Sequence, residues 1–456
     1  MTLERKPGGG RLAAAAVAVL VAAVALGVVG ASAAPPSADA TVVLNWNQIA
    51  VGTLTGLPQP AGGAAPTSQI NMGMVQGAVY DATNAITPKH HRPYLLKRRF
   101  GNTASDEAAV ATAAYLVLKN IVETVPPSID FPARGTVLAS LETQYNASKN
   151  AIPDSPFKNM GIAAGTAAAE AMIDARQGDG RFGESQEVQN SAPGQWNPEA
   201  PNGATVHDPT PWVGGVEPFL IQSSSQFQSA GPLALTSPAY TAEFNEIKAI
   251  GGNGVGTPST RTPTQTYIAR WWQSNPMASW NDVARQPIDR NDLDSSDAAR
   301  VLAMENLAAA DAAINTWNDK YHFNFWRPFQ AIRRAGELAE GNPDTEPDPT
   351  WTPLLSAPYP DHTSGHLGLD SSHTTVLKMF FGNAPEGGYQ ITSAAVNPGG
   401  TATRSFSSFS QAVDEIVEAR IWAGLHFRTA DVQAVELGTN VANYAAANYF
   451  ESVGNH

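Results

Sequence analysis

Helical periodicity constrains the fold of this chain more than any other feature of its sequence. Over much of its 456 residues, apolar side chains recur at the three- and four-residue spacing that places them on one side of a helix, alanine is abundant, and β-branched runs are few. No segment alternates apolar and polar residues convincingly. The pattern therefore predicts an all-α bundle protein. About eleven helices are expected, over residues 68–86, 106–125, 133–150, 157–176, 240–250, 264–275, 296–321, 328–339, 364–381, 408–425 and 429–450.

A long segment without this periodicity interrupts the chain. Residues 178–238 are rich in Gly, Pro and Asn, and a loop of that length is unusual unless it is functional or packs as a cover. Trp196, Trp212 and Phe219 favour a loop that lies against the body of the protein. We therefore expect two stacked helical bundles with a long Pro/Gly-rich covering loop. The N-terminal bundle plus the loop would occupy residues 42–237, and residues 238–456 would form the C-terminal bundle that carries the functional site.

The first residues have the composition of a secretory signal peptide. A basic stretch, residues 1–11, precedes an apolar run over residues 12–31, and Ala31-Ser32-Ala33 supplies a small-x-small cleavage pattern. Residues 1–33 are therefore predicted to be removed, which would leave a secreted or extracytoplasmic protein with no membrane association. The alternative is a retained anchor, because the apolar run is long enough to span a bilayer.

Charge and cysteine content exclude several functions. The formal charge is −13, and it becomes −15 when the three basic residues and one acidic residue of positions 1–33 are removed. An acidic exported protein is a poor partner for nucleic acid or anionic membranes. The chain has no cysteine, which excludes thiol catalysis, iron–sulfur clusters and Cys-ligated zinc.

Three short segments concentrate cations and imidazoles at expected helix ends. In WNDKYHFNFWRP, residues 317–328, Lys320 is expected on the last turn of one helix and Arg327 in the turn before the next, because Pro328 disfavours the α conformation of Arg327. A corner between two helices would then present two cations. Taken alone, the segment is more typical of a solvated basic edge, because surface Lys and Arg are common.

The second and third segments add hydroxyl, glycine and imidazole groups. Ser364, Gly365 and His366 follow Pro360 at an expected helix start, where free backbone N–H groups and the helix dipole favour an anion. In ARIWAGLHFRTAD, residues 419–431, Arg420 precedes His426 by six, and Gly424 would end the helix so that His426 turns back toward Arg420. An ordinary N-cap and an ordinary helix terminus are the alternatives for these two segments.

Together the three segments favour a site for a highly charged tetrahedral oxyanion. Lys320, Arg327 and Arg420 supply three positive charges, and the planar fork of each arginine matches such oxygens. Ser364 and Gly365 supply neutral donors. Of the two imidazoles, one could attack or ligate the bound group and the other could move protons.

The order Lys-x6-Arg-Pro, Ser-Gly-His and Arg-x5-His is similar to the signature of the vanadium-dependent haloperoxidases and of their relatives, the acid phosphatases of the type 2 phosphatidic-acid phosphatase superfamily. Four further segments, residues 44–56, 72–86, 237–251 and 266–273, resemble the bacterial haloperoxidase-like branch. The resemblance therefore covers most of the chain after residue 33.

The resemblance implies a vanadate cofactor and a role for each signature residue. The oxygens of vanadate would be held by Lys320, Arg327, Ser364, Gly365 and Arg420. His426 would ligate vanadium, His366 would be the acid–base group, and Lys320 would also polarise the peroxide. Trp317 and Tyr359 would line the halide pocket. The expected partners are hydrogen peroxide, a halide and an organic acceptor, and hypohalous acid would be the product.

The resemblance leaves several points open. Tyr359 stands where the chloroperoxidase pattern has Phe, so chloride and bromide both remain candidates. Asp431 follows His426 by five positions, whereas the family aspartate follows by four, and His362 is an additional imidazole that could contact the site or lie in an exposed loop. The oligomeric state is not predicted. The alternative enzyme is a secreted acid phosphatase with His426 as nucleophile and no vanadate, and a non-catalytic exported protein on the same scaffold is a further alternative.

Overall fold

Several helices of the protein begin at a polar residue followed by proline. We describe them in a computed structural model, which covers residues 38–86, 91–101, 103–335, 340–397 and 400–452. At Ser155, Ser237, Thr262 and Asn275 the side chain accepts a hydrogen bond from a backbone N–H of the first turn. The proline that follows each of them has no N–H to satisfy and a φ angle that suits a helix. The start of each helix is therefore set by two adjacent residues.

Thirteen α-helices are present among the described residues. They are α1 (Ala38–Thr55), α2 (Ala65–Asn84), α3 (Asp106–Glu123), α4 (Arg134–Ala151), α5 (Pro156–Ala175), α6 (Pro238–Ile250), α7 (Pro263–Trp271), α8 (Pro276–Arg290), α9 (Ser295–Phe323), α10 (Pro328–Arg334), α11 (Gly365–Phe381), α12 (Phe409–Trp422) and α13 (Arg428–Asn448). All eleven expected helices are found within a few residues of their predicted bounds. Residues 336–339 of the expected helix over 328–339 lie outside the described residues, as does the predicted signal peptide.

Two helices and a hairpin were not predicted. In α8 the internal Pro287 and a polar middle weaken the helical pattern, and α1 lies close to the apolar N-terminal run. The expectation of no strands was wrong, because β1 (Tyr389–Asn397) and β2 (Gly400–Phe406) pair antiparallel. Tyr389 and Ile391 are buried and alternate with exposed residues, a period of two that is too short to stand out.

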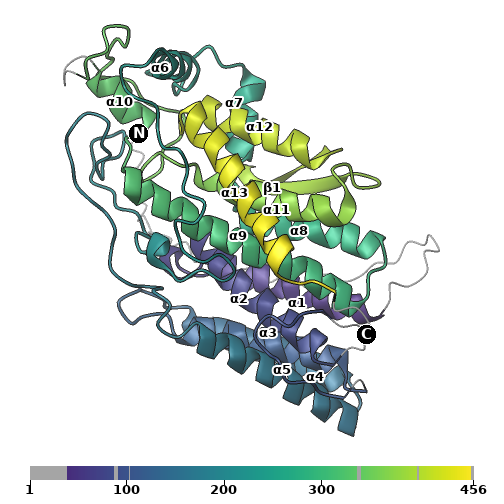
Figure 1. Ribbon diagram of the computed structural model, residues 1–456. Helices are drawn as coiled ribbons and strands as arrows, with labels where there is room; N and C mark the ends of the chain where they lie inside the picture. The colour runs from purple at the N-terminus through teal and green to yellow at the C-terminus, as the bar shows by residue number, and fades with distance from the viewer. Residues whose placement is uncertain (1–37, 87–90, 102, 336–339, 398–399, 453–456) are drawn as a thin grey trace, which may run out of the picture. The chain divides into compact units, whose positions relative to one another are not determined.

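Helix α9 is the central element of the fold. It packs against α2 on one side and against α11 and α13 on the other, so that helices from the two halves of the sequence share it (Figure 1). The all-α architecture of two bundles is confirmed, with the hairpin as its one addition among the described residues. Residues 36–456 form one compact unit, and the predicted boundary after residue 237 stays a prediction. Within the described ranges, no helix has the length and apolarity of a membrane span.

The covering loop packs against α9 through a row of side-chain acceptors. Asp311 accepts hydrogen bonds from the backbone N–H groups of residues 219–221 at 2.6, 2.7 and 2.9 Å. Asn315 and Asp319, four and eight residues further along the same helix face, accept from the backbone N–H groups of Phe227 and Ser229. Because these acceptors are buried, the loop is fixed along the helix toward its C-terminal end, where Lys320 lies.

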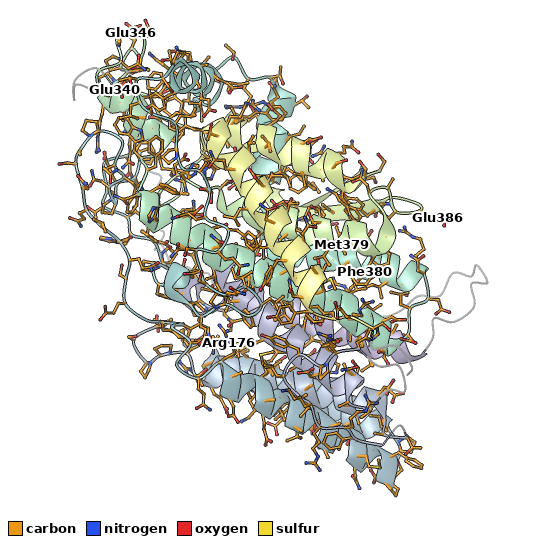
Figure 2. All side chains as sticks on the ribbon, in the orientation of Figure 1. Arg176, Glu340, Glu346, Met379, Phe380 and Glu386 are labelled. Atoms are coloured by element: carbon orange, nitrogen blue, oxygen red, sulfur yellow. The ribbon has the colours of Figure 1, made fainter. Side chains whose placement is uncertain are left out.

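Aromatic residues complete the attachment of the loop. Trp196, Trp212 and Phe219 are buried, which confirms the expectation that the loop lies against the body. Arg176, labelled in Figure 2, lies at the end of α5. It ion-pairs with Asp179 and stacks on the Phe219 ring, with its guanidinium carbon 3.9 Å from the ring centroid. The loop is thus attached both to α9 and to the end of α5.

Candidate active site

The corner between α9 and α10 positions two buried cations. Helix α9 ends at Phe323, and Asn324 adopts a left-handed conformation with φ of 45° that turns the chain out of the helix. Lys320 therefore lies on the last turn of α9, and Arg327 is the N-cap residue of α10, just before Pro328. Both side chains are at most 1% exposed, so the segment is not a solvated basic edge.

The Lys320 ammonium is directed at the loop before α11. Its Nζ donates to the backbone carbonyls of Pro360 at 2.9 Å, Asp361 at 3.2 Å and Thr363 at 2.5 Å. An ammonium has three donors, and all three are used here. Lys320 thus fixes the 360–363 loop, and the predicted contact with an oxyanion or a peroxide would require Nζ to release one of these carbonyls.

Arg327 is bound to the protein along one edge and is free along the other. Its Nε donates to the Tyr359 carbonyl at 2.7 Å and its Nη1 to the Leu425 carbonyl at 2.8 Å, and Nη1 also lies 3.2 Å from Nε2 of His426. Its buried Nη2 has no hydrogen-bond partner within the described part of the chain. The guanidinium is therefore oriented by two carbonyls and presents one unused donor beside His426.

Arg420 contributes two more unused donors. It lies in the last turn of α12, is 4% exposed, and has neither an Nε nor an Nη1 partner among the described residues. Its charge lowers the pKa of both His366 and His426. After α12, Gly424 takes a φ of 73°, and a Cβ there would lie 2.6 Å from the Gly251 carbonyl oxygen. This turn brings His426 back to the end of α12.

The start of α11 brings Ser364, Gly365 and His366 to the same site. Helix α11 begins at Gly365 with Ser364 as its N-cap residue, and the Ser364 side chain makes no capping bond. Backbone N–H groups of a first helical turn have no partner in their own helix, which favours an anion at this end. A Cβ on Gly365 would lie 3.0 Å from two ring atoms of Trp317, so any larger residue would require the Trp317 ring to shift.

His366 is the more accessible of the two imidazoles. It is partly exposed, whereas His426 is 2% exposed. Burial and the charge of Arg420 hold the pKa of His366 well below its ordinary value, against backbone hydrogen bonds with Ser274 and Trp272. Nε2 of His366 has no partner among the described residues. A neutral ring with an unused nitrogen can accept a proton.

Two buried carboxylates flank the site, and they have different partners. Asp361 Oδ1 lies 2.8 Å from Nδ1 of His426. Burial raises the pKa of Asp361 to about 7, against the lowering effect of Arg327 and Lys320. Asp431 lies near Ser364 and Arg420 instead; burial raises its pKa, and Ser364 and the charge of Arg420 oppose that rise. Asp361 was not singled out from the sequence, although it lies in the same short stretch as Ser364 and His366.

Trp317 and Tyr359, the two predicted pocket aromatics, lie together beside Lys320. Their ring centroids are 5.3 Å apart, and Nζ of Lys320 is 5.6 and 5.0 Å from the two rings. Trp317 is held from the covering loop, since Asp208 Oδ2 accepts from Trp317 Nε1 at 3.0 Å and from the Tyr321 hydroxyl at 2.7 Å. Sequence reasoning missed Asp208, because no spacing rule connects two residues 109 positions apart.

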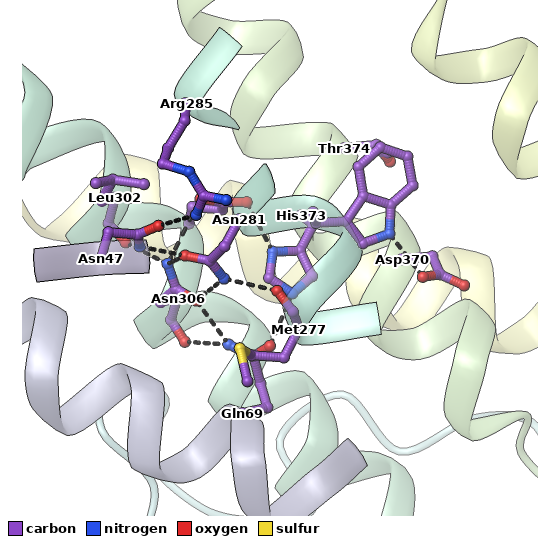
Figure 3. Close-up of polar contacts among 12 residues, drawn as sticks. Asn47, Gln69, Met277, Asn281, Arg285, Leu302, Asn306, Asp370, His373 and Thr374 are labelled. Atoms are coloured by element: carbon purple, nitrogen blue, oxygen red, sulfur yellow. Dashed lines mark hydrogen bonds and ion pairs between the residues drawn. The ribbon is translucent and has the colours of Figure 1, made fainter. Parts of the chain in front are cut away.

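The remaining histidines near the site are structural. His362 is 1% exposed, and its Nε2 contacts the Ser229 hydroxyl of the covering loop at 3.0 Å, so it is not in an exposed loop. His373, two turns along α11 from His366, lies between Glu305 at 3.0 Å and Gln69 at 2.8 Å in a buried polar network that also includes Asn281, Asn306 and Arg285 (Figure 3).

The donor set fits a vanadate ion. Vanadate needs one histidine nitrogen for the metal and several hydrogen-bond donors for its oxygens. The three unused guanidinium donors of Arg327 and Arg420 are buried, and a buried unpaired donor is costly unless a ligand pairs with it. His426 has a neutral ring, since burial and the charges of Arg327 and Lys320 hold its pKa well below the ordinary value. A tetrahedral phosphate makes the same demands.

Comparisons with known proteins agree with this geometry. Residues 300–455 match a family model described as the VCPO second helical-bundle domain. The chain is 23% identical over 425 residues to the vanadium chloroperoxidase of Curvularia inaequalis, which covers 76% of this chain but 66% of that relative, just under two thirds.

Solved structures show the same fold. A bacterial vanadium-dependent iodoperoxidase superposes with a TM-score of 0.71 at 21% identity, covering 91% of this chain and 98% of that one. A holo-type bacterial vanadium-dependent chloroperoxidase superposes with a TM-score of 0.65 at 16% identity, covering 87% and 93% of the two chains. The resemblance predicted from the signature is confirmed.

Proposed function

Given that the chain is a relative of the vanadium-dependent haloperoxidases, we propose that it oxidises a halide with hydrogen peroxide to hypohalous acid, which halogenates an organic acceptor. One observation carries the proposal. Three guanidinium nitrogens that have no partner in the described part of the chain are buried beside two neutral imidazoles at the start of a helix. Such a set neutralises a small, highly charged oxyanion and leaves one imidazole to bind it and one to move protons.

The residues would divide the work as follows. Arg327, Arg420 and the first backbone N–H groups of α11 would hold the oxyanion, and Nε2 of His426 would bind the vanadium. When bound, vanadate would supply Lewis-acid activation of hydrogen peroxide without a change of oxidation state. Nε2 of His366 would accept the proton that hydrogen peroxide loses, because this ring is neutral and its buried Nε2 has no partner among the described residues.

Trp317 and Tyr359 would border the path of the halide. Tyr359 is partly exposed, whereas Trp317 is fixed by Asp208 and by its packing on Gly365. The solved relatives are titled an iodoperoxidase and a chloroperoxidase, so fold alone does not select the halide. Iodide, bromide and chloride are therefore compared in the assay below.

The competing activity is that of an acid phosphatase. In that reaction Nε2 of His426 would attack phosphorus, His366 would protonate the leaving oxygen, and water would hydrolyse the phosphohistidine. The same cationic groups would bind the phosphate, because charge neutralisation dominates phosphoryl transfer as well. The haloperoxidase is preferred because the relatives found by both sequence and structure are haloperoxidases.

The decisive experiment compares the two activities in one preparation. Protein reconstituted with orthovanadate is assayed for halogenation of monochlorodimedone with peroxide and each halide, and protein without vanadate is assayed for hydrolysis of p-nitrophenyl phosphate. We expect vanadate-dependent halogenation that is lost in His426→Ala. Phosphatase turnover without halogenation would reverse the order, and absence of both activities would favour a non-catalytic exported protein.

We also propose that the protein is exported after removal of residues 1–33. The proposal rests on the apolar run and the Ala31-Ser32-Ala33 pattern, which lie outside the described residues. N-terminal sequencing of the protein from culture medium should begin at Ala34. Recovery of the full-length chain from the membrane fraction would instead support the retained anchor.

A further inference from the structure

The covering loop brings one carboxylate to two aromatic side chains near the end of α9. Asp208 is 4% exposed, and its Oδ2 accepts hydrogen bonds from Trp317 Nε1 at 3.0 Å and from the Tyr321 hydroxyl at 2.7 Å. Trp317 and Tyr321 are four residues apart and therefore share one face of the helix. A single oxygen atom of the loop thus holds both side chains.

The other oxygen of Asp208 fixes the carboxylate within its own loop. Oδ1 accepts from the backbone N–H of Thr210 at 2.7 Å and from the Thr210 hydroxyl at 2.9 Å. Both oxygens are therefore approached by donors, and the ionised carboxylate is the form that accepts from all four. Burial raises the pKa of Asp208, and the four hydrogen bonds oppose that rise.

The backbone of the loop touches the backbone of α9 beside Trp317. Shortly after Asp208 the chain forms a 3₁₀ turn, η2 (Val213–Gly215). A Cβ on Gly214 would lie 2.5 Å from the backbone nitrogen of Asn318, so a larger residue would push the loop and the helix apart. The spacing between loop and helix is therefore fixed next to the residue that Asp208 holds.

The Trp317 indole is held at two ends. Its Nε1–H donates to Asp208, whereas Cζ3 and Cη2 at the opposite edge pack on Gly365 at the start of α11. An indole has a single N–H, and Asp208 accepts it, so the ring presents carbon atoms in a fixed position toward Tyr359. The two ring centroids are 5.3 Å apart.

We infer that Asp208 is the positioning residue of Trp317, and that by fixing the indole relative to Tyr359 the covering loop decides which size of halide the pocket accepts. The halide selection rests on the proposed function, whereas the orientation of the indole does not. Pockets with fixed walls discriminate between ligands that differ by one methylene by about 10- to 200-fold, and a wall that can move discriminates less.

The orientation is tested without vanadate. Protein with ¹⁵N-labelled indole nitrogens is examined by proton–nitrogen spectroscopy, and Trp317→Phe identifies the Trp317 signal. We expect an Nε1–H proton that is shifted downfield by its bond to the carboxylate and is protected from exchange with solvent. In Asp208→Ala this signal should move upfield and exchange faster. Asp208→Asn is the second variant, because its amide NH₂ would face donors at one of the two oxygen positions, and its signal should also move.

Halide selection is tested in the same variants reconstituted with orthovanadate. Asp208→Ala should raise the ratio of kcat/KM for iodide to kcat/KM for bromide by about 10-fold, because a released indole can move away from Tyr359 and admit the larger ion. Orthovanadate affinity should stay unchanged. Asp311→Asn is the matched control: Asp311 binds the same loop to the same helix through three backbone N–H groups, whereas the single N–H of Trp317 goes to Asp208. This control should keep both the Trp317 signal and the halide ratio.

The possible results separate the two parts of the inference. An unchanged Trp317 signal in Asp208→Ala, or in Asp208→Asn if the first variant does not fold, would overturn the positioning role. An equal change in Asp311→Asn would do the same, because it would indicate general loosening of the loop. A moved signal with an unchanged halide ratio, or with a ratio shifted toward bromide, would overturn the size selection. A wild type with the expected signal but no halogenation would contradict the proposed function and leave the positioning of Trp317 intact.

Discussion

Replacing Arg327 with lysine keeps the positive charge of the site but removes the planar set of donors that the guanidinium provides. In the wild type, Nε and Nη1 reach two different carbonyls, of Tyr359 and Leu425, while Nη2 remains for a ligand. A lysine ammonium is one point and cannot reach both carbonyls and the ligand position together. Arg327→Lys should therefore affect both the oxyanion and the stability of the fold.

The expected magnitudes follow from the bonds that are lost. A hydrogen bond to a charged group contributes about 1.5–3 kcal/mol, so loss of the Nη2 donor should weaken orthovanadate and phosphate binding by about 10- to 150-fold. One buried carbonyl left without a donor should cost about 1–3 kcal/mol of unfolding free energy. Affinity is measured by calorimetric titration of the vanadate-free protein, and stability by denaturant unfolding.

Arg333→Lys is a matched control for this prediction. Arg333 lies on α10, the helix that begins directly after Arg327, and it also bridges two carbonyls, with Nε donating to Trp351 and Nη2 to Pro201 at 2.7 Å each. It should lose similar stability and keep its affinity for oxyanions. Equal losses of affinity in both variants, or no loss in Arg327→Lys, would refute the idea that the orientation of Arg327 defines the anion-binding site.

Three further outcomes are expected. Gly365→Ala should displace Trp317, because the added Cβ lies 3.0 Å from its ring; a change in halide preference together with a loss of about 1–3 kcal/mol in stability is expected, and unchanged halide kinetics would contradict it. His366→Gln should lower kcat by about 10²- to 10⁴-fold with little change in orthovanadate affinity, since its role is proton transfer; equal losses in both would point to a ligand-holding role. In the wild type, burial raises the pKa of Glu305 well above its ordinary value, so this side chain is the neutral acid in the folded protein. In Glu305→Gln the amide can still donate a hydrogen bond to Nδ1 of His373, but it cannot titrate. The wild type should therefore lose unfolding free energy by about 1.4 kcal/mol per unit as the pH rises above the unfolded value of 4.5 toward the folded one, and the variant should lack that loss; parallel curves would contradict this assignment.

Much of the helical fold could be read from local sequence. The start of a helix is specified within a few positions when a polar residue precedes proline and apolar residues follow at helical spacing. For this reason helices such as α6 and α7 begin close to where they were expected. Helix α8 was missed because Pro287 and its polar middle are unfavourable locally, and its stability comes from packing of Trp280 and neighbouring side chains in the core. The hairpin was also missed because packing outside the hairpin stabilises it: the Tyr389 ring stacks on Phe409, with ring centroids 5.0 Å apart.

The candidate site likewise has a part that local sequence predicts and a part that only the tertiary structure sets. Spacing and residue type were enough to identify three segments that carry Lys320, Arg327, Ser364, His366, Arg420 and His426, because each segment is a helix end with its own start or stop signal. Whether a side chain at such an end faces water, a carbonyl or a ligand depends on what the rest of the chain brings against it. Tertiary structure alone directed the Lys320 ammonium to three loop carbonyls, placed Asp361 behind His426 and held Trp317 with Asp208. These are contacts between residues far apart in sequence, and they exist only after the helices have packed.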